Sequence, residues 1–101
     1  MTEDSPGVLG KPVSIKVRVD GSVVAIVKTD RVGRRSAVLP SESLPLETDS
    51  FVELELFDGV DRLVLPAKVT EVSEGELTVV YEQSGKTFEH WLTTRRWKKP
   101  G

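Results

Sequence analysis

The chain has few of the residue types that carry reactive chemistry. Among its 101 residues there is no cysteine, one methionine and a single histidine, His90. Without thiols it forms neither disulfides nor thiolate metal sites, and one imidazole makes neither a metal site nor a nucleophilic triad. The absence of cysteine also fits a reducing cytosol. We therefore expect a cytoplasmic protein that is not an enzyme, with no catalytic residues, no metal and no firmly indicated cofactor.

Long apolar runs are missing as well. No stretch approaches the ~20 apolar residues that a membrane span needs, and the acidic, polar residues 1–7 are unlike a signal peptide. The hydrophobic fraction of 38% and the charged fraction of 30% are ordinary for a soluble globular protein. The length fits one domain, small enough that nearly every strand must contribute to the core. We expect no membrane span.

The charges, by contrast, are strongly segregated along the chain. Residues 11–35 hold seven basic and two acidic residues, residues 42–82 eleven acidic and two basic, and residues 86–101 five basic and one acidic. Basic residues beside Trp91 and Trp97 are of a kind that can bind single-stranded nucleic acid. The pI of about 5.4, however, is far from the basic character of nucleic-acid-binding proteins. We therefore expect a protein partner rather than nucleic acid.

Alternation of apolar and polar residues predicts a β protein. The pattern is regular over residues 13–19 and 51–57, as in strands with one buried and one wet face. Asp20-Gly21 favours a tight hairpin turn, and Pro66 predicts an edge or a bulge. Residues 40–50 read as a loop. Short spacing between turns indicates a small six-stranded antiparallel barrel, with strands over residues 13–19, 23–27, 36–39, 51–57, 63–72 and 77–81.

The C-terminal segment carries mixed signals. Phe88, Trp91 and Leu92 recur at helical spacing, and two arginines follow where they suit a helix C-terminus. Adjacent threonines at 93 and 94 favour a strand instead. We favour a short helix across one end of the barrel. The expected organisation is a flexible tail over residues 1–11, a barrel over 12–90 and a helix or basic tail over 91–101.

One candidate ligand site lies between the second and third predicted strands. Guanidinium groups suit phosphates because they offer paired donors in a plane, and a glycine lets backbone approach a ligand closely. The alternative is that the arginines only balance the acidic middle of the chain, and the sequence leaves both readings open. The candidate ligand-binding residues are Arg31, Gly33, Arg34 and Arg35.

A second candidate surface is acidic. Glu53 and Glu55 share one strand face, which is more typical of a solvated surface than of a catalytic pair. With the aspartates of the following turn they predict a surface open to a basic protein partner, and the C-terminal tryptophan predicts a tail that docks on another protein. The candidate partner-binding residues are Glu53, Glu55, Asp58, Asp61 and Trp97.

From residue 13 to residue 82 the chain resembles the PilZ family of small bacterial barrels. Two strands lead into Lys28-Thr29-Asp30-Arg31-Val32-Gly33, and "FVELELF" (51–57), "LVLPAKVTEV" (63–72) and "ELTVVYE" (76–82) are similar to the closing strands of that family. The resemblance implies a non-catalytic receptor or adaptor in bacterial cyclic-di-GMP signalling. It makes cyclic-di-GMP a possible ligand.

The departures from the family bear on this ligand. The family's R-x-x-x-R pair precedes the first strand, but residues 1–12 contain no arginine. In the family's [D/N]-x-S-x-x-G motif, Lys28 replaces the acid and Asp30 the serine, so that only Gly33 matches. Arg31 and Arg35 have the R-x-x-x-R spacing at a different place in the fold. The resemblance implies either a degenerate member that acts through protein contacts, which we favour, or a divergent one with a new arginine site.

A second resemblance competes in the C-terminal half. Residues 67–92, "AKVTEVSEGELTVVYEQSGKTFEHWL", are similar to a Tudor- or chromo-barrel segment. That resemblance implies a module binding a methylated-lysine peptide or nucleic acid, with an aromatic cage around a cation. The same aromatics are equally suited to an ordinary core, which we favour. The candidate cage residues are Phe57, Tyr81, Phe88 and Trp91.

Overall fold

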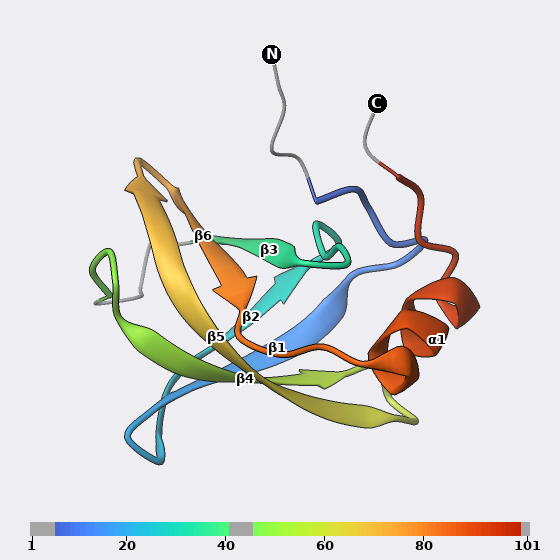
Figure 1. Cartoon of the computed structure of the whole chain (residues 1–101), viewed down its shortest axis with the longest axis horizontal. Helices are drawn as coiled ribbons and strands as arrows, with labels where there is room; N and C mark the ends of the chain where they lie inside the picture. Colours follow the sequence, from blue (N-terminus) through green and yellow to red (C-terminus); the bar gives the residue numbers. More distant parts are fainter. Residues whose placement is uncertain (1–5, 41–45, 100–101) are drawn as a thin grey trace.

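The computed structural model describes residues 6–40 and 46–99. Within them the chain forms six strands followed by one helix (Figure 1). The elements are β1 (Val13–Val19), β2 (Ser22–Thr29), β3 (Ser36–Pro40), β4 (Phe51–Phe57), β5 (Arg62–Ser73), β6 (Glu76–Tyr81) and α1 (Lys86–Thr94).

The strands form one antiparallel sheet in the order β2-β1-β4-β5-β6-β3. The sheet curls until its two outermost strands approach each other, as Figure 1 shows. There the Thr29 hydroxyl donates to the Val38 carbonyl (3.0 Å), and the Val38 N–H donates to the Arg31 carbonyl (2.9 Å). The result is a curled half-barrel with a short C-terminal helix, which confirms the predicted fold class.

Several strands are longer than their apolar runs predicted. β2 and β5 each extend past the predicted ends because ladder hydrogen bonds continue into the polar residues beside the turns. Pro66 pairs with Glu53 of β4, and its carbonyl accepts from Glu82, just beyond the end of β6 (2.8 Å). β5 lies inside the sheet, so Pro66 is not on an edge strand. Because β6 ends at Tyr81, opposite Ala67, the missing proline N–H still interrupts no β5–β6 pair. The β5 bulge lies elsewhere, between Val69 and Glu71.

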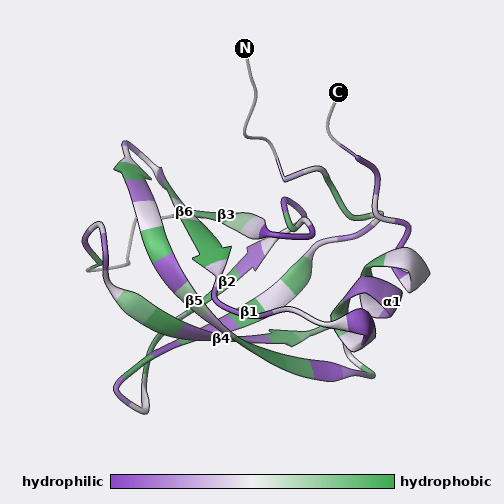
Figure 2. Ribbon diagram, in the orientation of Figure 1, coloured by the Kyte–Doolittle hydropathy of each residue, from purple (hydrophilic) through white to green (hydrophobic). Residues whose placement is uncertain are grey.

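Alternation along the strands fills one core inside the curl. Ile15, Val17 and Leu54 are fully buried. Figure 2 shows hydrophobic and hydrophilic residues alternating along the strands. Helix α1 covers one end of this core with the side chains of Phe88, Trp91 and Leu92. The predicted helix is thus confirmed, and it begins at Lys86, inside the range assigned to the barrel.

Part of the segment predicted to be a flexible tail is described by the structure, and these residues, from residue 6 onward, are packed against the rest of the chain. Val8 and Lys98 exchange backbone hydrogen bonds (3.1 and 2.8 Å), and the Gly10 N–H donates to the Arg95 carbonyl (2.9 Å). Leu9 is buried in the core. Residues 6–10 and 95–98 together are called the terminal clasp below. Residues 1–5, 100–101 and, in the predicted loop, 41–45 lie outside the described residues.

Candidate functional site

The predicted ligand loop, residues 31–35, lies beneath the terminal clasp. Gly33 is buried, and a Cβ atom built on it would lie 2.0 Å from the Pro6 carbonyl oxygen. The Tyr81 hydroxyl shares its one proton between the Gly33 carbonyl (3.1 Å) and the Ser36 carbonyl (3.0 Å). The close backbone approach that this glycine permits is therefore made by the chain's own N-terminal segment.

The three arginines of this loop have different surroundings. Arg31 forms an ion pair with Glu76 at the start of β6. The Arg34 guanidinium lies over the Trp97 ring, 5.5 Å from its centroid. Arg35 is exposed, and its side chain has no partner among the described residues. Two of the three guanidinium groups thus have a partner within the chain, although Arg34, like Arg35, is exposed.

The acidic turn after β4 also binds within the chain. Asp58 forms an ion pair with Arg95, and the Arg95 Nη2 donates to Asp61 Oδ2 (2.7 Å). The other Asp58 oxygen accepts from the backbone N–H groups of Val60 and Asp61, both at 2.8 Å. The Asp58 and Arg95 side chains are only 16% and 17% exposed. These aspartates therefore attach the end of α1 to the β4–β5 turn.

Glu55 is the most extensively paired carboxylate on the sheet. Although it points away from the core, it is only 7% exposed. Arg18 donates to its Oε1 (2.6 Å), and Arg62 Nε and Lys16 Nζ lie 3.2 and 4.0 Å from Oε2. The hydrogen bond from Arg18 lowers the pKa of Glu55 despite the opposing desolvation. The charge of Glu55 is thus balanced by its neighbours and is not open to a basic partner.

The surroundings of Glu55 belong to a larger surface, which we call the outer face. It comprises the residues of β2, β1, β4 and β5 that point away from the core. Strand register places Ile26, Lys16, Glu55 and Val64 in one cross-strand row. The next row, at the C-terminal end of β4, contains Lys28, Ser14, Phe57 and Arg62.

The basic character of the outer face was not predicted from the sequence. Its basic residues come from strands that are separate in the sequence, and the acidic run containing Glu53 and Glu55 lies between them. The polar positions of the first predicted strand indicated outward Lys16 and Arg18. The predicted hairpin turn at Asp20-Gly21 placed the second strand on one side of them, but nothing in the sequence indicated that β4 would lie on the other. The face carries the basic residues Lys16, Arg18, Lys28, Arg62 and Lys68 and the acidic residues Glu53, Glu55 and Glu71.

The aromatics considered for a methyl-lysine cage do not form an open one. Tyr81 and Phe88 meet edge to face with centroids 5.1 Å apart, and Phe88 and Trp91 stack at 6.0 Å. All three are buried in the core. Phe57 lies on the outer face, against Arg62. A cage has to admit a cation between its rings, and these four aromatics are divided between the two faces of the sheet.

Trp97 is part of the terminal clasp. Its Nε1 donates to the Pro6 carbonyl (3.1 Å), and its ring packs partly buried against the core and under Arg34. The tryptophan predicted to dock on another protein therefore docks on its own N-terminal segment. It holds Pro6 over the loop that contains Gly33.

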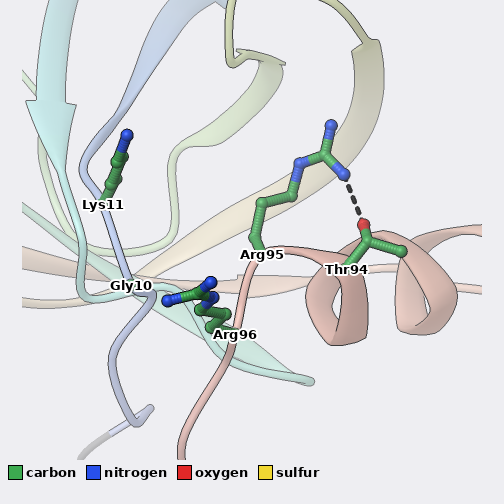
Figure 3. Close-up of a pocket in the computed structure, with 5 residues that line it drawn as sticks. All are labelled: Gly10, Lys11, Thr94, Arg95 and Arg96. Carbon is green, nitrogen blue, oxygen red and sulfur yellow. Dashed lines mark hydrogen bonds between the residues drawn. The ribbon is translucent and has the colours of Figure 1, made fainter.

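A shallow cationic cleft lies beside the clasp, lined by Gly10, Lys11, Thr94, Arg95 and Arg96 (Figure 3). Arg95 turns toward Thr94, with which it forms a hydrogen bond, and toward the acidic turn. Lys11 and Arg96 are exposed and form no ion pair within the described part of the chain. Asp58 and Asp61 offset the charge of Arg95, which leaves this cleft only weakly cationic.

No group of three or more potential metal-binding side chains occurs among residues 6–40 and 46–99. His90 is exposed on α1. In the described part of the chain, no helix has the length and apolar character to cross a membrane. Comparisons with protein families, curated proteins and solved structures each found no match to this chain.

Proposed function

We propose that this chain is a non-catalytic PilZ-like domain that works as an adaptor through protein contacts. Its setting would be the cytoplasm of a bacterium that uses cyclic-di-GMP signalling. Six antiparallel strands followed by a helix are compatible with this proposal. The proposal also holds that residues 31–35 no longer bind the nucleotide, so that the domain acts through another surface.

The observation that carries this proposal is the position of Pro6 over Gly33. A nucleotide phosphate approaching the loop backbone would have to displace the Pro6 carbonyl, which Trp97 holds by a hydrogen bond. It would also compete with Glu76 for Arg31 and with the Trp97 ring for Arg34. Breaking these contacts would reduce the affinity for the nucleotide, because the binding free energy is the gain from new contacts minus the cost of those that are lost.

Amide chemical shifts of the labelled protein during titration with cyclic-di-GMP test the proposal. We expect no saturating shift in residues 31–35 beyond that produced by GMP at matched ionic strength, which reports charge effects alone. Saturating shifts centred on these residues, abolished by Arg31→Ala or Arg35→Ala in a folded variant, would show a nucleotide receptor and overturn the proposal.

A further inference from the structure

The outer face leaves large apolar side chains in solvent around a charged centre. Ile26 is 63% exposed, Val64 48% and Phe57 39%. Register places Ile26 and Val64 at the two ends of the row that contains Lys16 and Glu55, and Phe57 in the adjacent row. Apolar groups gathered in this way on a polar surface are typical of interaction sites.

The charge of the outer face differs from that of the whole chain. The chain has a net charge of −2, yet this face has five basic and three acidic side chains, an excess of two positive charges. One of the five, Lys68, is also paired with Asp49 at the margin of the face (3.5 Å). Glu55 already has three cationic neighbours, and Glu53 lies 3.9 Å from Arg18. An acidic partner is therefore favoured by charge complementarity. A second copy, presenting the same positive excess, would be repelled.

A groove in this face combines both features. It is lined by Ser14, Lys16, Ile26, Glu55, Phe57 and Arg62. Ile26 and Phe57 supply apolar walls. The Arg62 side chain is 64% exposed and contacts Glu55 through Nε, so its terminal nitrogens face solvent. Guanidinium nitrogens of this kind suit a carboxylate in a partner.

We propose that this groove binds an acidic segment of a partner protein. One apolar side chain of the segment lies between Ile26 and Phe57, and its carboxylates pair with Arg62 and Lys16. This inference deepens the proposed adaptor function, on which it rests, by assigning its surface and the chemistry of its partner.

A selection experiment tests the groove without a known partner. The probe is a library of random twelve-residue peptides displayed on phage and selected on the intact chain. We expect enriched peptides to be acidic and to contain aromatic or large aliphatic residues. When synthesised, these peptides should bind at least ten times more weakly to Ile26→Asp and to Phe57→Asp than to the native chain, because both residues line the groove. Raising the salt concentration should weaken binding further.

Val60→Asp is the matched control, because Val60 is 85% exposed but lies in the β4–β5 turn. It should bind these peptides as the native chain does. Circular dichroism establishes that all three variants are folded. Failure to enrich any peptide, enrichment of basic peptides, or equal binding by native and Phe57→Asp chains would overturn the inference. So would a dimer in light scattering that Ile26→Asp dissociates, since the groove would then hold a second copy.

The two proposals fail in distinguishable ways. Cyclic-di-GMP shifts in residues 31–35 would overturn the proposed function while leaving peptide binding at the groove to be scored separately. Equal peptide binding by Phe57→Asp and Val60→Asp would overturn the groove proposal and leave the nucleotide titration unaffected.

Discussion

Residues 31–35 and the outer face both place cations beside apolar side chains, but the two groups of cations differ in their partners and in their access to solvent. In the loop, Arg31 and Arg34 are engaged by Glu76 and Trp97, and the terminal clasp covers Gly33. On the outer face, Lys16 and Arg62 surround one carboxylate and still reach solvent. A dense cluster of arginines in the sequence is therefore a poorer guide to a free surface than cations distributed over neighbouring strands.

The same contrast applies to the acidic residues. Asp58 and Asp61 bind Arg95 and so hold the end of α1, while Glu55 is balanced by residues of β1 and β5. The four acidic residues predicted to form a partner-binding surface, Glu53, Glu55, Asp58 and Asp61, thus each lie within 4 Å of a basic group of the same chain.

Trp97→Ala should have the largest effect on stability and would test whether the terminal clasp is structural. It removes a partly buried indole, its hydrogen bond to Pro6 and its contact with Arg34. We expect a loss of about 2–4 kcal/mol in the free energy of unfolding, measured by urea denaturation followed by circular dichroism. Phe51→Ala on the outer face, where the ring is 63% exposed, should cost under about 1 kcal/mol. Equal losses for the two would show that the regions do not differ.

Gly33→Ala is expected to displace the clasp from the loop. The added methyl group would meet the Pro6 carbonyl at 2.0 Å, and such overpacking costs about 1–3 kcal/mol. Amide shifts of Val8 and Leu9 should change together with stability. Gly85→Ala is the control, because a Cβ there meets no atom within 4 Å and the backbone φ is −129°. Unchanged shifts at residues 6–10 in Gly33→Ala would contradict the packing described.

Arg95→Gln tests the attachment of α1 to the acidic turn. It leaves the poorly exposed carboxylate of Asp58 without its cation, and hydrogen bonds to charged groups are worth about 1.5–3 kcal/mol. We expect a loss near the lower end, with increased hydrogen exchange in α1. Arg96→Gln changes the adjacent exposed residue, which has no ion pair among the described residues, and should be nearly neutral. A neutral Arg95→Gln would mean that the turn does not anchor the helix.

Changes of pH should have the smallest effect on stability, because neither Glu55 nor Tyr81 changes its protonation state near neutral pH. Arg18 lowers the pKa of Glu55, so the stabilisation is present above the ordinary glutamate value of about 4.3 and is lost as the pH falls through the lowered pKa. Burial raises the pKa of Tyr81, so its contribution is present below about pH 10 and is lost as the pH rises through the raised pKa.

Urea midpoints measured across the pH range check these directions. Glu55→Gln should flatten the acid limb and leave the alkaline limb unchanged, and Tyr81→Phe should do the reverse. An acid limb identical in the native and Glu55→Gln chains would show that the ion network on the outer face does not contribute to stability.

The strands were predictable because the alternation of apolar and polar residues that indicates each one lies within a short stretch of sequence. Val13–Val19 and Phe51–Phe57 alternate without a break, and both form strands with the expected inward residues. The helix was predictable from Phe88, Trp91 and Leu92, all of which are buried. The candidate site residues were harder to interpret, because the partners of Arg31, Arg34 and Asp58 lie far along the chain.

The amino-acid sequence by itself determined which residues of each strand enter the core, since side chains alternate between faces with a period of two. It also determined the turns and the absence of thiol chemistry. Only the tertiary structure decided which charges remain free. Ion pairing depends on the order of strands in the sheet, and β1 lies beside β4 although more than thirty residues separate them. That order placed Arg18 against Glu55, and the packing of residues 6–10 placed Pro6 over Gly33.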